Sequence, residues 1–214
     1  MARNTLFTDN TIRADNSDLG AVWDPYTGAD SGRIHSNLIK PNAVTNLAGQ
    51  ETYNGTIPAN DQWASVKIRT INPSVYVNAG VAVRHSAPST ITGYLAAVQF
   101  HDIFIGKNIA GVFTLLASAS YTVPANPQNI DVSLEVVGTG LEAFIDLVSK
   151  VSTTDASIAS GRTGVVWYVD TGGTNEDVML TDFAMGDFSA SSNKAGPLSS
   201  GPILKSLVGG SLVS

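Results

Sequence analysis

The chain of 214 residues contains no cysteine, so disulfide bonds and thiolate metal sites are excluded. Charged residues make up only 14% of the sequence, and the formal net charge is −6. No cluster of lysine and arginine is available to neutralise phosphates, and we therefore expect no nucleic-acid partner. The acidic balance does not by itself identify another partner.

Long apolar runs are also missing, and no stretch is long enough to cross a bilayer, so we expect no membrane partner. Residues 1–4 lead into polar sequence without the apolar region of a signal peptide. We therefore expect synthesis in a cytoplasm without a secretion signal. Assembly into a virus particle released by lysis would be one way out of that compartment.

Alternating apolar residues between glycine-rich turns are what the sequence does have, and they are clearest in residues 131–188. Val132, Leu134 and Val136 share one face of the first run, and residues 141–148 return after the turn at 138–140. Such a period of two predicts antiparallel strands with one buried face.

The same pattern fills most of the chain and predicts twelve or more strands. The further expected strands cover residues 34–40, 51–57, 62–71, 75–84, 92–100, 102–107, 111–117 and 120–123. The run at 75–84 is apolar at nearly every position, which indicates a central strand buried on both faces. We predict an all-β, two-sheet antiparallel jelly-roll sandwich over residues 1–188.

The last segment, residues 189–214, mixes glycine, serine and proline with apolar residues and lacks a clear period. Exposed apolar side chains would be a liability in water, so we predict a linker and an extended docking arm that binds a neighbouring subunit. A floppy terminus or a final edge strand is the alternative. The expected partner-binding residues are Ile203, Leu204, Leu207, Val208, Leu212 and Val213.

Two segments resemble laminin-G-like or concanavalin-A-like jelly-roll domains of the kind found in bacteriophage structural proteins. Residues 7–23 resemble the opening of these domains through Arg13, Ala14, Asp15, Leu19, Gly20 and Trp23. Ile12 stands where the family usually has an aromatic residue. Residues 134–183 resemble the closing half, which ends in a strand with Asp182 and Phe183. The resemblance implies the sandwich fold, which hosts lectins, glycosidases, adhesion modules and virion proteins.

The resemblance also implies a structural calcium ion near the N-terminal segment and the last strand, since the family commonly binds one there. Asp9 and Asp182 are the candidate ligands by this analogy. Carboxylate oxygens suit calcium. The alternative is that both aspartates only cap turns, and no other cofactor is expected.

Catalytic residues are not evident in the sequence. Glu135, Glu142 and Asp146 are the nearest carboxylates to a glycosidase pair, but alternation with apolar residues favours solvent-facing positions. The three histidines are scattered, and no Gly-x-Ser-x-Gly motif occurs. We therefore predict that the chain is not an enzyme.

Aromatic residues on strands could stack against sugar rings. The aromatic residues on expected strands include Trp63, Tyr76, Tyr94, Trp167 and Tyr168. Of these, Trp63, Tyr94 and Trp167 are the candidate glycan-binding residues. Aromatic residues make up only 7% of the chain, and packing inside the sandwich is the alternative role. A lectin function would require a concave sheet face with an exposed aromatic residue and a convergent pair of Asn or Asp.

Two functions remain open at this point. The first is a bacteriophage virion structural protein, such as a capsid decoration or head or tail accessory protein, that contacts other virion proteins and self-associates, with a trimer favoured. The absence of a secretion signal, the phage-type opening and the apolar tail favour it. The second is a carbohydrate-binding module for attachment to a host or glycan.

Overall fold

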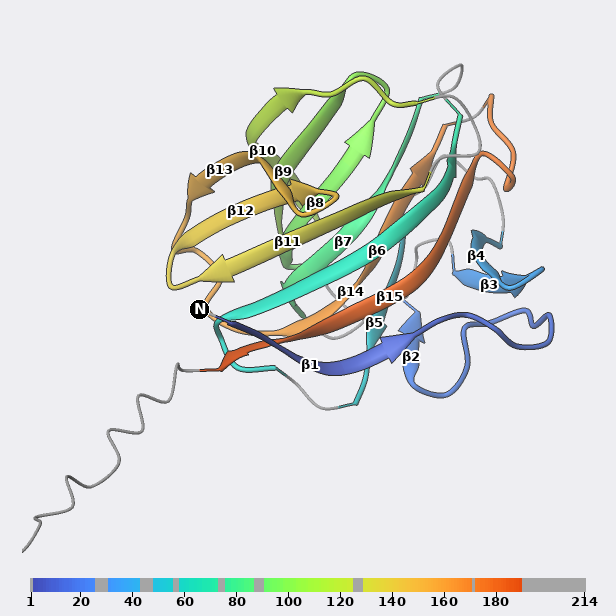
Figure 1. The fold of residues 1–214 in the computed structure, drawn as a ribbon, viewed down its shortest axis with the longest axis horizontal. Coiled ribbons are helices and arrows are strands. Elements are labelled where there is room, and N and C mark those ends of the chain that lie inside the picture. The colour runs from blue at the N-terminus through green and yellow to red at the C-terminus, as the bar shows by residue number, and fades with distance from the viewer. Residues whose placement is uncertain are drawn as a thin grey trace, which may run out of the picture.

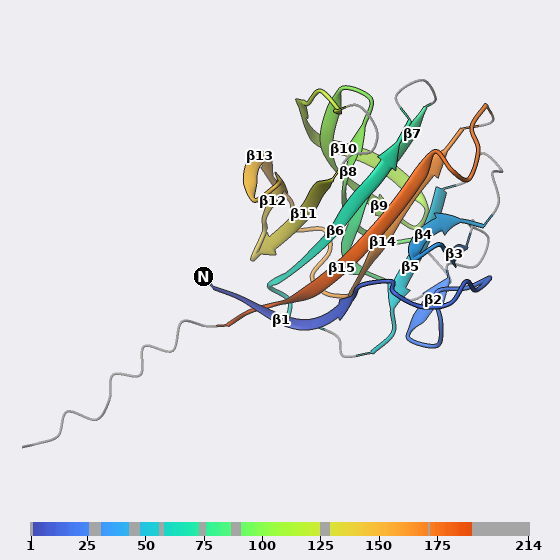
Figure 2. The same cartoon turned by 45° about the vertical axis from the view of Figure 1, so that its right-hand side comes forward.

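A computed structural model describes residues 2–25, 31–42, 48–55, 58–72, 76–86, 91–124, 129–170 and 172–189. The described residues form two antiparallel sheets that face each other as a sandwich (Figure 1; Figure 2). No helix occurs in these ranges, so none of them holds a helix long and apolar enough to cross a membrane.

Sheet A contains, in spatial order, β13 (Val148–Thr154), β12 (Gly140–Ile145), β11 (Ile130–Val137), β6 (Gln62–Ile71), β15 (Val178–Ser189), β4 (Leu38–Pro41) and β3 (Gly32–His35). A further strand, β1 (Ala2–Asp9), pairs with β15. Sheet B contains β10 (Val112–Ser120), β9 (Asp102–Ile109), β8 (Gly93–Gln99), β7 (Val77–His85), β14 (Arg162–Val169), β5 (Ala48–Tyr53) and β2 (Trp23–Pro25). The predicted all-β, two-sheet antiparallel sandwich is confirmed.

The core lies between the sheets, and the alternation of the sequence places it there. Val132, Leu134 and Val136 are fully buried on the inner face of β11, as their period of two predicts. Val81 and Val83 of β7 meet them from sheet B as part of the same cluster. Removal of this apolar surface from water is the main favourable contribution to folding.

Several predicted strand bounds in sheets A and B are wrong. The expected strand at 34–40 is two strands, β3 and β4, because Ser36 and Asn37 have positive φ and form the turn between them. The expected strands at 111–117 and 120–123 form one strand, β10, which continues to Ser120. The expected strand at 141–148 ends at Ile145, because Asp146 and Leu147 both have positive φ and form the turn to β13. Leu147 is therefore exposed rather than in register with the core residues of β12.

The predicted central strand at 75–84 is β7, which lies between β8 and β14. Its outer face carries Gly80 and Ala82, which are buried although they point away from the core. A Cβ atom on Gly80 would lie 1.9 Å from the carbonyl oxygen of Ala96, so no side chain fits there. The outer face of sheet B therefore has a depression at its centre.

The predicted docking arm and its six apolar residues lie outside the described residues, which end at Ser189. The structure thus leaves the division between residues 1–188 and 189–214 as a prediction.

Candidate functional site: a groove on the outer face of sheet B

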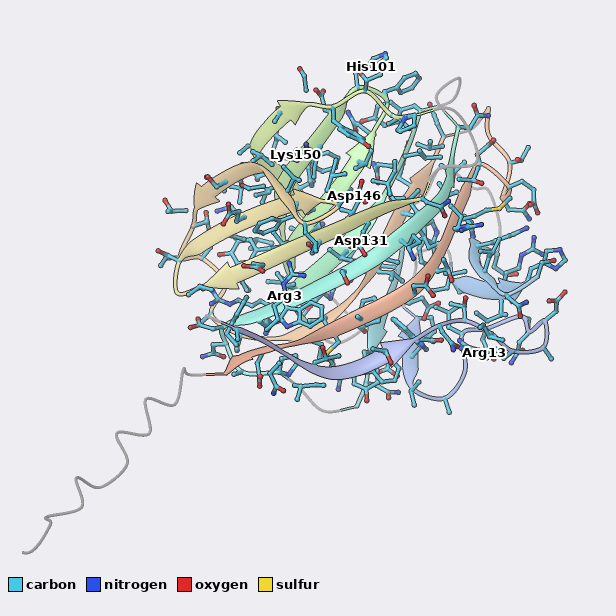
Figure 3. The ribbon with its side chains drawn as sticks, viewed as in Figure 1. Arg3, Arg13, His101, Asp131, Asp146 and Lys150 are labelled. Atoms are coloured by element: carbon cyan, nitrogen blue, oxygen red, sulfur yellow. The ribbon has the colours of Figure 1, made fainter. Side chains whose placement is uncertain are left out.

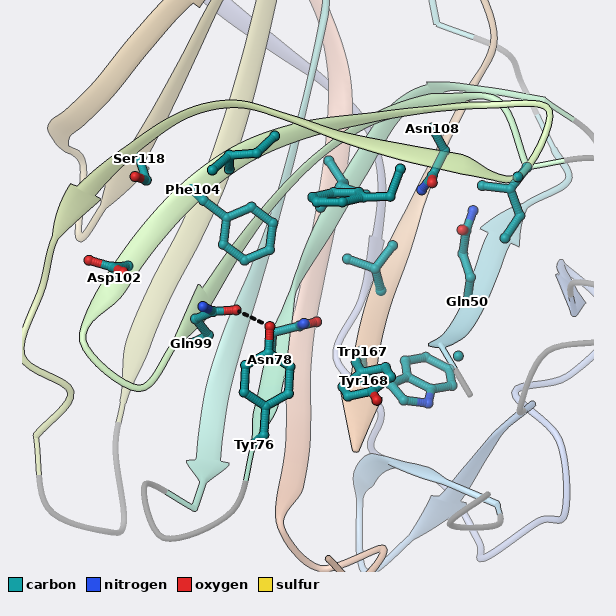
Figure 4. Close-up of a pocket in the computed structure, with 17 residues that line it drawn as sticks. Gln50, Tyr76, Asn78, Gln99, Asp102, Phe104, Asn108, Ser118, Trp167 and Tyr168 are labelled. Carbon is teal, nitrogen blue, oxygen red and sulfur yellow. Dashed lines mark hydrogen bonds between the residues drawn. The ribbon is translucent and has the colours of Figure 1, made fainter. Parts of the chain in front are cut away.

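A groove with a volume of about 590 Å³ crosses the outer face of sheet B (Figure 4). Its size lies within the range typical of sites for small ligands. Strands β10, β9, β8, β7, β14 and β5 all contribute to it. The lining residues are Gly49, Gln50, Tyr76, Asn78, Ile91, Leu95, Gln99, Asp102, Phe104, Asn108, Gly111, Phe113, Leu115, Ser118, Val166, Trp167 and Tyr168.

Polar side chains form one line across the groove, which we call the polar row. Asp102 pairs with Gln99, Gln99 with Asn78, and Asn78 with Tyr168 in the register of four neighbouring strands. Because paired residues of neighbouring strands point to the same face, the four side chains stand side by side. Amide and carboxylate groups of this kind can accept hydrogen bonds from hydroxyls, and the amides can also donate them.

A second line of residues lies two positions further along each strand. Its members are apolar or very small, and we call it the apolar row. Phe104 pairs with Ala97, Ala97 with Gly80, and Gly80 with Val166. The small residues at its centre lower the floor between Phe104 and Val166. The polar and apolar rows therefore run parallel to each other across the strands.

Aromatic rings flank the two rows. Tyr76 is 47% exposed, and its ring meets Tyr168 edge to face at a centroid distance of 5.6 Å. Its hydroxyl donates a hydrogen bond to Gln99 Oε1 over 3.2 Å (Figure 4). Among the described residues no hydrogen bond engages the Gln99 amide nitrogen, which can donate to a ligand. At the other end, Phe104 and Phe113 meet edge to face at 6.1 Å. The groove thus has an exposed aromatic residue, Tyr76, in contact with Gln99 and Tyr168 of the polar row.

The charge of the groove is low. Of the described lining residues, Asp102 is the only acidic one, and none is Lys, Arg or His. At the β5 end, Gln50 is buried, and within the described structure its Nε2 atom has no hydrogen-bond partner. A buried donor without a partner is costly, and a ligand atom that accepts from it would remove that cost.

The sequence predicted Trp63, Tyr94 and Trp167 as glycan-binding residues, and the structure does not bring them together. Trp167 lines the groove, but its side chain is only 2% exposed because it packs in the core. Tyr94 is also in the core, where its hydroxyl donates to Asp155 Oδ1 over 2.8 Å. Burial, together with the bond to Asp155, raises the pKa of Tyr94.

Trp63 lies on the outer face of sheet A, on the other side of the sandwich. The guanidinium of Arg3 covers it, with its carbon 4.9 Å from the ring centroid, and Arg3 Nε donates to Glu135 over 2.7 Å. The groove has two exposed aromatic residues: Tyr76 is among the strand aromatics considered for sugar stacking but not among the three candidates, and Phe113 is in neither group. Only the strand register, which the sequence does not show, places them beside the polar and apolar rows.

The two candidate calcium ligands are both engaged by cations. Arg13 binds both oxygens of Asp9, over 2.6 and 3.0 Å, and Trp23 Nε1 donates to the same carboxylate over 3.0 Å. Asp182 forms an ion pair with Lys67 at 2.9 Å. Calcium needs several oxygen ligands that are free to bind it, and the oxygens of these two carboxylates already accept from cationic side chains. In the described residues no group of three acidic or histidine side chains is placed to hold a metal ion. Calcium at this pair is an expectation from the family resemblance alone, and these contacts oppose it.

The glutamates considered for catalysis lie on sheet A and not in the groove. Glu135 and Glu142 face each other across β11 and β12, but Glu135 is paired with Arg3 and Glu142 accepts from Ser149. Asp146 lies in the following turn, where its carboxylate accepts from the backbone of Asp131 (Figure 3). These contacts agree with the solvent-facing positions that the alternation favours.

The histidines are dispersed, as the sequence indicates. His35 ends β3, His101 lies in the exposed turn before β9, and His85 ends β7. Burial lowers the pKa of His85 to about 4, so its imidazole is neutral at physiological pH. The sequence gives no sign of this burial, because it arises from packing against Gly93 of the neighbouring strand.

Comparison with solved structures places the fold among lectin-like β-sandwiches. The chain is similar to a protein of unknown function with a galectin-like fold from Bacillus subtilis, with a TM-score of 0.65, 11% identity and coverage of 87% of this chain and 97% of that one. It is also similar to the carbohydrate-binding module CBM66 from Bacillus subtilis, with a TM-score of 0.61, 12% identity and coverage of 77% and 94%.

The metal-free carbohydrate recognition domain of Emp46p gives a TM-score of 0.62 at 10% identity, with coverage of 87% of this chain and 99% of that chain. No profile of a known protein family matches the sequence, and no curated protein matches it. At these identities the likeness concerns the fold alone. The fold part of the expected resemblance is confirmed, whereas its link to bacteriophage structural proteins stays a prediction.

Proposed function

We propose that this chain is a carbohydrate-binding, lectin-like module and that the groove on sheet B is its binding site. The observation that carries the proposal is the exposed aromatic ring of Tyr76 next to the polar row. Sugars present an apolar C–H face and a rim of hydroxyls. An aromatic surface beside amides and a carboxylate offers a partner to each of these.

Two further points support binding to sugars. CBM66 and the Emp46p domain, which share the fold, are described as carbohydrate-binding. The VIP36 lumenal domain, in a structure bound to Ca²⁺ and Man3GlcNAc, also shares it, with a TM-score of 0.60, 10% identity and coverage of 79% of this chain and 86% of that one. The shared fold supports a sugar ligand in general terms, and the residues of the groove provide the specific argument.

We propose binding without hydrolysis. Glycoside hydrolysis usually needs two carboxyl groups that flank the scissile bond. Among the described lining residues, Asp102 is the only carboxylate. The proposal that the chain is not an enzyme therefore rests on the composition of the groove.

A glycan array followed by titration calorimetry on the best ligand tests the function. We expect Tyr76→Ala to weaken binding about fivefold, because a stacked aromatic contributes on the order of 1 kcal/mol. Val148→Ala, at an exposed apolar position on sheet A, is the matched control and should bind like the wild type. An array without any hit, or equal binding by both variants and the wild type, would overturn the proposed site.

A further inference from the structure

We infer that the groove binds an uncharged, linear oligosaccharide that lies across the strands of sheet B, with its hydroxyl edge on the polar row and its C–H faces on the apolar row. This inference rests on the proposed function and specifies its ligand. It concerns the direction, length and charge of the sugar chain, none of which follows from the fold.

The direction follows from how the chemistry is distributed. Across the strands, Asp102, Gln99 and Asn78 follow one another in direct register, and so do the members of the apolar row. Along a single strand the character changes instead, for example from Asp102 through Phe104 to Asn108 on β9. A repeating chain finds a repeated environment only when it runs across the strands.

The distance between the rows also suits a sugar ring with one polar edge. Corresponding members, such as Asn78 and Gly80, are two residues apart on one strand, which is roughly 7 Å. A ring stacked over the low floor of the apolar row can therefore direct hydroxyls to the amides of the polar row. Gln99 is already oriented for this, because the hydroxyl of Tyr76 holds its Oε1 atom.

The length of the groove favours several sugar residues. Lining residues come from six consecutive strands between β10 and β5, and neighbouring strands are about 4.8 Å apart. Five such spacings give roughly 24 Å, which a single sugar ring does not fill. Gln50, whose buried Nε2 atom has no partner within the described structure, lies beside Val166 at the β5 end and offers a donor to the last residue of a long ligand.

The charge argument excludes acidic sugars. Asp102 is the only acidic residue among the described lining residues and none of them is basic, so they offer no cation to pair with a carboxylate or sulfate. An anionic ligand would lose its hydration and gain only repulsion from Asp102. Neutral chains meet no such cost.

Titration calorimetry with the full chain tests length and charge. The probes are neutral β-1,4-linked and β-1,3-linked gluco-, manno- and galacto-oligosaccharides of one to six residues, and the C6-oxidised uronate form of each tetrasaccharide. We expect the affinity to rise at least tenfold from the monosaccharide to the tetrasaccharide. We also expect the uronate form to bind at least tenfold more weakly than its neutral counterpart.

Three substitutions test the direction of the ligand. Asn78→Ala and Gln99→Ala should each weaken tetrasaccharide binding about fivefold to tenfold, the loss expected for one or two hydrogen bonds. Asn108→Ala, in the groove but away from both rows, should cost clearly less. Asn4→Ala, on the exposed face of β1, is the matched control for folding and should bind like the wild type.

The outcomes separate this inference from the proposed function. If monosaccharides bind as tightly as tetrasaccharides, or if the uronate form binds more tightly, the groove is a sugar site but not for an uncharged chain. Equal losses for Asn78→Ala and Asn108→Ala would place the ligand along the strands. No binding by any neutral or acidic glycan would overturn both the inference and the proposed function.

Discussion

Asp9 connects the opening motif of the chain to the stability of the sandwich. Its carboxylate is buried and receives hydrogen bonds from Arg13, Trp23 and the backbone of Thr11. Burial by itself would raise the pKa of Asp9, but the bonds from Arg13, Thr11 and Trp23 more than offset this effect and lower it. The residues that suggested a family motif therefore form a structural cluster.

We predict that Asp9→Asn lowers the free energy of unfolding by about 2 kcal/mol at pH 7, because the guanidinium of Arg13 loses its negatively charged partner. Since the pKa of Asp9 is lowered in the folded state, its contribution is present above its ordinary value of 3.8 and is lost as the pH falls through the folded value. The difference between variant and wild type in urea denaturation should thus be constant from pH 7 to pH 5 and shrink below pH 4. Asp18→Asn, an exposed turn position, is the control. An unchanged midpoint for Asp9→Asn would contradict the structural role.

At the scale of elements, β15 is interrupted by a bulge at Asp182. The register with β6 shifts between Thr181 and Ala184, and Asp182 has a φ of 51°. The bulge turns the Asp182 side chain outward to Lys67. Asp9 pairs with Phe183, one residue further along β15, so both calcium candidates lie close together, yet each is already paired with a cation.

From this geometry we predict that the melting temperature is the same in calcium and in chelator, because neither carboxylate has the free oxygens that the ion needs. Scanning calorimetry of the wild type and of Asp182→Asn under both conditions checks this. A rise in the wild type with calcium that is absent in Asp182→Asn would instead support the calcium site that the family resemblance implies.

Most of the strands and their inner faces could be predicted from the sequence, whereas β1 and the groove could not. Alternation is a local property, so it identified the buried side of β11 and the bounds of β6. The polar row joins Asn78, Gln99 and Asp102 through the pairing of three strands, which depends on turn geometry and packing. Trp63 shows the same limit, because nothing local indicates that Arg3 covers it from another strand.

At the scale of the whole molecule, the two ends of the described chain meet. Ala2 pairs with Ser189, so β1 closes sheet A beside the last strand (Figure 1). The first and the last strand of the described residues therefore lie side by side in sheet A. The docking arm at 189–214, self-association into a trimer and a place in a virion stay predictions that this arrangement neither requires nor opposes.

We predict that a chain ending at Ser189 keeps the free energy of unfolding of the full chain to within about 0.5 kcal/mol, since no described strand is removed. It should also keep its glycan affinity, because no lining residue of the groove is lost.

If the arm holds neighbouring subunits, sedimentation velocity should show an oligomer for the full chain and a monomer for the shortened one. A full-length variant with Ile203, Leu204 and Leu207 changed to serine should then behave like the shortened chain, which would separate loss of apolar contacts from loss of length. An oligomer that survives both changes would place the contact on the sandwich, and a monomeric full chain would remove the docking role of the arm.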